Sequence, residues 1–248
     1  MKPSVAKGGV KVGKASICDI YKTMDIQSVI KKRGITRLCH MTEIENLLAI
    51  LEKGTGILAN DFIASEKRKI NDLTRLDGRT DFISTSVQYP NVWYYNYKKS
   101  DKDWCIIFID TSICRRDNTL FCPVNAATQC GAYLGTGANS FRSLFADEVN
   151  GRERTETMLE CCPTDDQAEI MIYKEIPVSY IQGIAFENHT VSEKFRTLAE
   201  ERCIEWPSLY LTPDLFNTSL SRKIRAGVRP PEIIYDEESE LWQKDLCL

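Results

Sequence analysis

The chain has 248 residues, of which 43% are hydrophobic and 27% are charged. This balance is typical of a globular protein and excludes a wholly disordered, collagen-like or coiled-coil chain. The longest apolar runs, such as 106–109, are too short to cross a bilayer, and the first residues lack the apolar core of a secretion signal. We therefore expect a cytoplasmic protein that has no membrane partner.

The formal net charge of −3 is unevenly distributed along the chain. Residues 1–37 contain nine Lys or Arg residues and two Asp residues, so this part has a charge of +7 and the remainder −10. A local basic segment permits contact with nucleic-acid phosphates, but the same pattern is typical of a solvated tail. Residues 1–16 are rich in Lys and Gly and are expected to be a flexible arm.

The next elements are expected in the order helix, strand, helix. A short helix is predicted over 24–33 and a strand over 35–42, where apolar and polar residues alternate. Thr42 is expected to open the clearest helix of the sequence, which has leucines at helical spacing and ends at Gly54. A strongly charged loop is predicted over 60–81.

The second half of the chain is expected to combine strands with a few helices. Strands are predicted over 82–87, 104–110, 168–176 and 180–188, and helices over 140–148 and 192–203. Pro90 argues against a continuous strand after 87. Short strands with helices mainly before and after them favour the α+β class. We expect three parts: a basic arm with a short helix (1–34), a folded domain (35–203), and a proline-interrupted extension (204–248) packed on it.

The chain has ten cysteines but only two histidines. No CxxC motif occurs, and the vicinal pair Cys161–Cys162 does not suit a zinc knuckle, so no metal site is expected. Most cysteines are therefore interpreted as reduced, buried apolar residues. GxGxxG and GxxxxGKS motifs do not occur either, which leaves Rossmann and P-loop nucleotide sites without support.

Three polar residues are candidates for a site. His40 ends a predicted core strand, Asn46 lies in the next helix, and Glu169 begins a later strand. Each has an ordinary alternative, namely a core histidine, a surface amide and an exposed strand end. Cys39 and His40 are neighbours, but alternation along a strand directs them to opposite faces, which argues against a nucleophile pair.

The order of several segments resembles a known family. RLCHMTEIENLLAILEKGTGIL, RLDGRTDFISTSVQYPN, FCPVNAAT and CCPTDDQAEIMIY follow one another between about residues 36 and 187. They resemble successive blocks of the DarT family, toxins that ADP-ribosylate bases in single-stranded DNA, and this chain resembles a divergent branch of it. The resemblance implies the split, curved β-sandwich of ADP-ribosyltransferases with flanking helices.

The resemblance also implies the co-substrate and the residues that use it. NAD would lie between the two sheets, and Glu169 would bind the 2′-hydroxyl of the nicotinamide ribose as the catalytic carboxylate. An arginine completes the family's site; Arg75 is favoured over Arg79, which is assigned to NAD. The other NAD-binding residues implied are His40, Met41, Thr42 and Asn46.

The expected substrate is single-stranded DNA or RNA, with thymine, guanine or adenine as the modified base. Aromatic residues interleaved with lysines between 89 and 102 suit a groove that stacks bases, although at least half of the aromatic residues are expected in the core. The predicted nucleic-acid-binding residues are Tyr89, Trp93, Tyr95, Lys98, Arg152 and Arg154. An antitoxin protein is an expected partner. Gln167, two residues before Glu169, leaves protein ADP-ribosylation open, and an inactive binding module is a further alternative.

Overall fold

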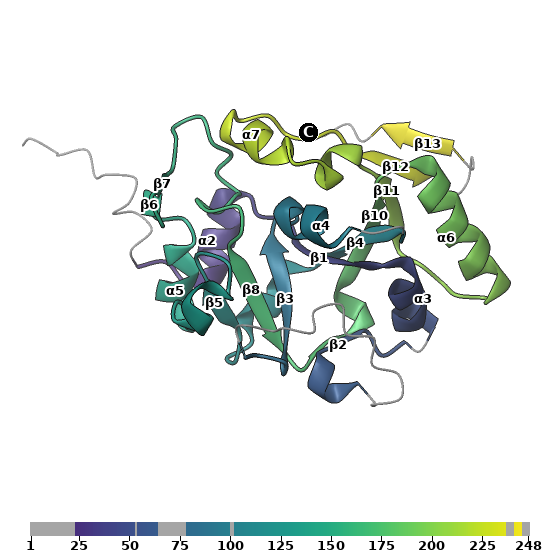
Figure 1. The fold of residues 1–248 in the computed structure, drawn as a ribbon, viewed down its shortest axis with the longest axis horizontal. Helices are drawn as coiled ribbons and strands as arrows, with labels where there is room; N and C mark the ends of the chain where they lie inside the picture. Colours follow the sequence, from purple (N-terminus) through teal and green to yellow (C-terminus); the bar gives the residue numbers. More distant parts are fainter. Residues whose placement is uncertain (1–22, 53, 64–77, 100–101, 237–240, 245–248) are drawn as a thin grey trace, which may run out of the picture.

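A twisted sheet of nine strands runs through the computed structural model, which describes residues 23–52, 54–63, 78–99, 102–236 and 241–244 (Figure 1). The strand order is β13-β12-β11-β10-β4-β1-β3-β8-β5. The bounds are β1 Leu38–Glu43, β3 Phe82–Val87, β4 Trp104–Ile109, β5 Leu120–Cys122, β8 Glu169–Tyr173, β10 Ile181–Phe186, β11 Ser208–Leu211, β12 Ile233–Asp236 and β13 Leu241–Lys244. Two small ladders pair β2 (Ile57–Leu58) with β9 (Glu175–Ile176) and β6 (Glu148–Val149) with β7 (Arg152–Glu153).

The strand β4 occupies the middle of the sheet because it is apolar throughout. All six of its residues are buried, and it pairs antiparallel with β1 on one side and β10 on the other. Strands that are covered on both faces read as continuous apolar runs, which is why its central place could be predicted.

The sheet divides between β1 and β3. These strands pair only at Leu38↔Val87 and Cys39↔Ser86, whereas β1 stays paired with β4 through Glu43. Beyond Cys39, strands β1 and β3 are no longer paired with each other. The mixture of a largely antiparallel sheet with helices placed before, between and after its strands confirms the predicted α+β class.

Helices cover the sheet at several places (Figure 1). Their bounds are α2 Ile26–Arg33, α3 Ile44–Glu52, α4 Val92–Lys98, α5 Gly137–Ser143, α6 His189–Glu201 and α7 Leu220–Arg225. Short 3-10 turns are η1 Asn60–Phe62, η3 Thr111–Arg115, η4 Thr128–Gly131, η5 Val178–Tyr180 and η6 Pro213–Phe216. The apolar face of α3 buries Ile44, Leu47, Leu48 and Leu51.

Several predicted bounds were wrong by a few residues. Thr42 does not open α3, because β1 continues through Glu43 in register with β4. The strand expected over 168–176 is two strands, since β9 leaves β8 to pair with β2. Helix α5 starts at Gly137 and ends at Ser143 rather than running over 140–148.

The last part of the chain extends the sheet. Strand β11 runs parallel to β10, and β12 pairs antiparallel with β11. A buried ion pair also joins the segment before β12 to the segment before β1, because Arg37 Nη1 lies 2.8 Å from Glu232 Oε2. The predicted arm over 1–16 lies outside the described residues.

The eight cysteines among the described residues are free thiols. Six of them are buried, which confirms that most cysteines serve as apolar core residues. Among the same residues, no group of three or more His, Cys, Asp or Glu side chains is placed to hold a metal ion. None of the described helices combines the length and apolar character that crossing a membrane requires.

Candidate active site

Glu169 is held by two hydrogen-bond donors at the start of β8. The backbone N–H of Ala126 donates to its Oε1 over 2.9 Å, and the hydroxyl of Ser84 donates to its Oε2. Glu169 is 9% exposed, so its carboxylate is largely shielded from solvent. An ionised carboxylate only accepts hydrogen bonds, so this pair of donors fixes Glu169 as a carboxylate of defined orientation.

His40 lies one residue beyond the last pair between β1 and β3. Its Nδ1 is 2.9 Å from the carbonyl oxygen of Ser84, so its side chain spans the place where the strands part. A carbonyl oxygen can only accept, and Nδ1 must therefore carry the proton. In the neutral ring this leaves Nε2 as the acceptor atom of the imidazole.

Ser84 connects the two predicted site residues. Its carbonyl oxygen accepts from His40, and its hydroxyl donates to Glu169, which lies on the neighbouring strand β8. The strand over 82–87 was predicted, but Ser84 was not among the predicted site residues. The alternation of side chains along 84–86 could have identified Ser84, because it places Ser84 and Ser86 on one face of the strand and Thr85 on the other. Thr85 donates instead to the carbonyl of Ile170, within the core.

The NAAT segment supplies the second donor to Glu169. Asn125 accepts a hydrogen bond from the N–H of Ala127 over 2.9 Å, which forms a tight turn around Ala126. The turn directs the Ala126 N–H to the carboxylate. A backbone donor of this kind cannot be recognised from residue type, so it was not predicted from the sequence.

Three of the other predicted NAD-binding residues, Met41, Thr42 and Asn46, lie near His40 in the chain. Thr42 is buried near the end of β1, and Asn46 in α3 donates to its hydroxyl over 3.4 Å. Met41 is half-buried against the core. Arg79 is exposed, with its guanidinium 5.3 Å from the centre of the Phe82 ring. Arg75 lies outside the described residues.

Cys39 and His40 do not form a pair. The Cys39 thiol is buried and contacts the carbonyl of Gln88 at 3.3 Å, whereas His40 contacts Ser84. Burial raises the pKa of the Cys39 thiol to about 12, so it is not a nucleophile at neutral pH. The expected alternation of the two side chains is confirmed.

Two of the predicted base-stacking residues are in the core. Tyr89 is 5% and Tyr95 is 7% exposed, so their assignment to nucleic-acid binding is corrected. Segment 92–98 forms α4, which presents alternate aromatic residues to opposite sides. Trp93 is 44% and Tyr97 is 82% exposed, and Lys98 Nζ lies 5.5 Å from the ring centre of Tyr97.

The two arginines ahead of Glu169 differ in their surroundings. Arg154 donates to the carbonyls of Leu159, Glu160 and Cys162, so it holds the segment together and its assignment to phosphate is corrected. Arg152 pairs with Asp166 at 2.5 Å, while 38% of its side chain remains exposed.

Comparison with known proteins agrees with this geometry. The sequence model of the family described as "ssDNA thymidine ADP-ribosyltransferase, DarT" matches residues 39–216. The fold resembles Thermus sp. 2.9 DarT in complex with NAD+ (TM-score 0.53, 15% identity, covering 73% of this chain and 98% of that one). It also resembles that protein in complex with ADP-ribosylated ssDNA (TM-score 0.54, 15% identity, 74% and 97% covered). Thermosipho africanus DarTG in complex with ADP-ribose gives a TM-score of 0.51 at 19% identity, with 73% and 51% covered. No curated protein gives a significant sequence match.

Proposed function

Because the chain belongs to the DarT family of NAD-dependent ADP-ribosyltransferases, which modify single-stranded DNA, we propose that His40, Ser84 and Glu169 are the residues with which it performs this reaction. The observation that carries the proposal is the pair of hydrogen bonds that fixes the Glu169 carboxylate beside the division of the sheet. We further propose that 35–203 is the catalytic domain, and that the protein acts in the cytoplasm, where its thiols stay reduced.

The residues around the division fit NAD. After Cys39 the backbone of β1 is no longer paired with β3, so its polar groups can bond to a nicotinamide amide. When the imidazole of His40 is neutral and Nδ1 carries the proton, its Nε2 atom is an acceptor suited to a ribose hydroxyl. Thr42 and Asn46, which bond to each other at the start of α3, would support the same region.

Glu169 would supply the electrostatic part of catalysis. When nicotinamide leaves, positive charge develops on the ribose to which it was attached. A carboxylate that accepts the 2′-hydroxyl of this ribose stabilises that charge, and the effect is large when the carboxylate is already fixed. Ser84 and Ala126 provide this fixation, so Glu169 does not need to reorient during the reaction. The same carboxylate could then take the proton from the base nitrogen that attacks the sugar carbon.

The acceptor would be an unstacked base, since a nitrogen within a stacked duplex cannot reach the sugar carbon. Trp93 and Tyr97 provide exposed rings on α4, and Lys98 adds charge beside them. Proteins that bind single strands without strict sequence preference combine aromatic rings and cationic side chains on one surface. Arg79 is exposed, shortly before the start of β3, and is the described candidate for the pyrophosphate; Arg75 is the alternative.

A radiolabel experiment tests this function. The protein is incubated with NAD labelled in the adenylate part, and with DNA oligonucleotides that each contain one type of base, matched RNA, or a protein mixture. We expect label on one DNA oligonucleotide, and loss of that label in Glu169→Gln, which keeps the shape of the side chain but removes its charge. Label on RNA or on protein alone would contradict the proposal, and the labelled oligonucleotide identifies the base.

We also propose that the chain is a toxin with an antitoxin partner, on the resemblance to DarT toxins. Induced expression should then stop growth of the host cell, and the Glu169→Gln variant, produced at the same level, should be harmless. Equal toxicity of both proteins would show that the effect does not come from ADP-ribose transfer.

A further inference from the structure

Asp166 lies three residues before Glu169 and receives hydrogen bonds from three elements that are distant in sequence. Its Oδ2 accepts from the indole N–H of Trp93 in α4 over 2.9 Å, and from the hydroxyl of Ser221 in α7 over 2.5 Å. Its Oδ1 accepts from Arg152 in β7 over 2.5 Å. One carboxylate therefore ties α4, α7 and the β6–β7 hairpin to the segment that leads into the catalytic strand.

The carboxylate of Asp166 is largely buried and needs these donors. Its side chain is 14% exposed. Burial alone would raise the pKa of Asp166, but the hydrogen bonds from Ser221 and Trp93 and the charge of Arg152 lower it below its ordinary value. A charge-assisted hydrogen bond is stronger and better aligned than one between neutral groups. The three partners are therefore held in defined positions.

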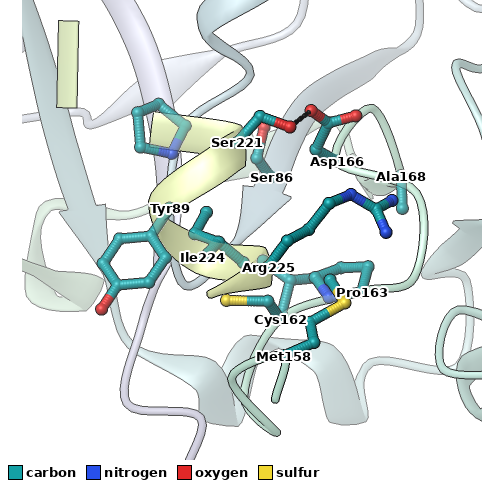
Figure 2. A pocket seen from close by; sticks show the side chains of 12 residues that line it. Ser86, Tyr89, Met158, Cys162, Pro163, Asp166, Ala168, Ser221, Ile224 and Arg225 are labelled. Carbon is teal, nitrogen blue, oxygen red and sulfur yellow. Dashed lines mark hydrogen bonds between the residues drawn. The ribbon is translucent and has the colours of Figure 1, made fainter. Parts of the chain in front are cut away.

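Helix α7 packs directly on the segment before Glu169. Figure 2 shows Ser221, Ile224 and Arg225 of α7 facing Met158, Cys162, Pro163 and Asp166 across a small pocket. The pocket has a volume of about 20 Å³, enough for about one water molecule and far too little for a base. Its size indicates that α7 acts as a support for this segment rather than as one wall of a ligand site.

Further hydrogen bonds fasten the same segment to α7. The Arg225 guanidinium donates to the carbonyls of Glu153 and Thr164 over 3.0 and 2.9 Å. The carbonyl of Arg225 accepts from the hydroxyl of Thr157 over 2.8 Å. Helix α7 begins at Leu220, beyond residue 216, where the family match ends. The support comes from a part of this chain that the family match does not include.

Among the three described partners of Asp166, Trp93 is the one with an exposed aromatic ring. Its N–H is bonded, yet 44% of the residue is exposed. A ring held in place by its own N–H loses little freedom when a flat ligand stacks on it, so binding costs less conformational entropy. Stacking of a base on an aromatic ring contributes about 1–3 kcal/mol per base.

We infer that Trp93 is the residue on which a base of the single-stranded DNA stacks, and that Asp166 and Ser221 are positioning residues that hold its ring against the segment leading into Glu169. This inference rests on the proposed transfer to single-stranded DNA. If Trp93 is held in this way, helix α7 contributes to binding of the DNA acceptor and does not contribute to binding of NAD.

The test compares variants of Trp93 and Ser221 in the full-length protein. Trp93→Phe keeps a ring but removes the N–H, and Ser221→Ala removes the hydroxyl that Asp166 accepts. Ser221→Thr restores a hydroxyl, and its added methyl group can enter the pocket that Ser221 lines. Ser219→Ala is the matched control, since the Ser219 side chain makes no hydrogen bond among the described residues. Binding of a fluorescent single-stranded oligonucleotide gives the Kd for DNA, and initial rates of transfer at varied NAD concentration give the KM for NAD.

We expect Ser221→Ala and Trp93→Phe to raise the Kd for the oligonucleotide about fivefold, equivalent to ~1 kcal/mol, with the KM for NAD unchanged. Trp93→Ala should raise the Kd further, whereas Ser221→Thr and Ser219→Ala should bind as the wild type does. Unchanged DNA binding in Ser221→Ala and Trp93→Phe, or an equal loss of DNA and NAD binding, would overturn the inference. If the wild type transfers no label to DNA, the proposed function fails, and the Kd values still decide the role of Trp93.

Discussion

The hydroxyl of Ser84 donates a hydrogen bond to Oε2 of Glu169, and this bond joins β3, which borders the division of the sheet, to β8, which carries the carboxylate. Because the carbonyl of the same serine accepts from His40, one residue sets the relative placement of the two sides of the site. A rigid carboxylate is worth more to catalysis than a mobile one, since no energy is spent on orienting it as charge develops.

Replacement of Ser84 by alanine should therefore impair catalysis without unfolding the protein. A hydrogen bond to a charged group contributes about 1.5–3 kcal/mol, so kcat of Ser84→Ala should fall about ten- to hundredfold. Thr85→Val is the matched control on the opposite face of β3, where the hydroxyl bonds to the carbonyl of Ile170. It should lower the free energy of unfolding by ~1 kcal/mol and leave kcat unchanged. A wild-type kcat in Ser84→Ala would show that Ala126 alone fixes Glu169.

Neighbouring substitutions at 39 and 40 should separate co-substrate binding from stability. His40→Ala removes the imidazole from the place where β1 and β3 part, and the KM for NAD should rise about tenfold, equivalent to ~1.4 kcal/mol. Cys39→Ala removes a buried thiol on the other face, so it should cost ~1 kcal/mol of unfolding free energy and leave that KM unchanged. Steady-state kinetics with varied NAD and a denaturant titration measure the two effects. A KM that rises equally in both variants would mean that distortion of β1, and not loss of the imidazole, is responsible.

The candidate site could be predicted from the sequence only in part. Glu169 begins β8 as expected, and β3 was predicted with its observed bounds because its alternation is regular. His40 was expected to end a strand, but it lies inside β1, which continues through Glu43. Ser84 required knowledge of register, since its partner on β8 is 85 residues away. The donor from Ala126 belongs to the backbone and has no sequence signature.

Segment 89–98 shows why the aromatic residues were only partly predicted. Its aromatic residues favour a strand by residue type, but Asn91 accepts the N–H of Tyr94 and caps a helix instead. The helix buries Val92 and Tyr95 and exposes Trp93 and Tyr97. Which face of α4 is buried depends on its packing against η6, which is far away in the sequence. The bonds from Trp93 and Ser221 to Asp166 likewise span 73 and 55 residues.

The buried pair of Arg37 and Glu232 should make the C-terminal strands necessary for stability. Both residues are less than 10% exposed, and the Arg37 guanidinium also lies 3.8 Å from the ring centre of Phe108. Glu232→Gln would leave Arg37 as a buried charge without its counter-charge and should lower the free energy of unfolding by about 3 kcal/mol. The double variant Arg37→Met, Glu232→Leu removes both charges and should recover most of this loss. Urea titration of the three proteins measures these values, and a single variant as stable as the wild type would contradict the expectation.

Asp110 should make a stabilising contribution that depends on pH. Its Oδ1 accepts the N–H of Ser112 over 2.7 Å and its Oδ2 accepts from Gln182 over 2.8 Å, which connects the end of β4 to β10. The hydrogen bonds from Ser112, followed by that from Gln182 and the charge of Arg115, lower the pKa of Asp110 below its ordinary value of 3.8. A carboxyl whose pKa is lower in the folded state stabilises the fold at pH above its ordinary value, and this contribution is lost as the pH falls through the folded-state value.

Asp110→Asn should therefore be less stable than the wild type at pH 7, and the difference should vanish at acidic pH. Because Asp110 is largely solvated, we expect a difference of only about 0.5 kcal/mol at neutral pH. Urea titrations at pH 7, 5 and 3 would measure it. Gln182→Ala removes one of the two donors and should show a smaller difference with the same pH dependence. A difference that stays constant from pH 7 to 3 would mean that the shape of the Asp110 side chain matters and that its charge does not.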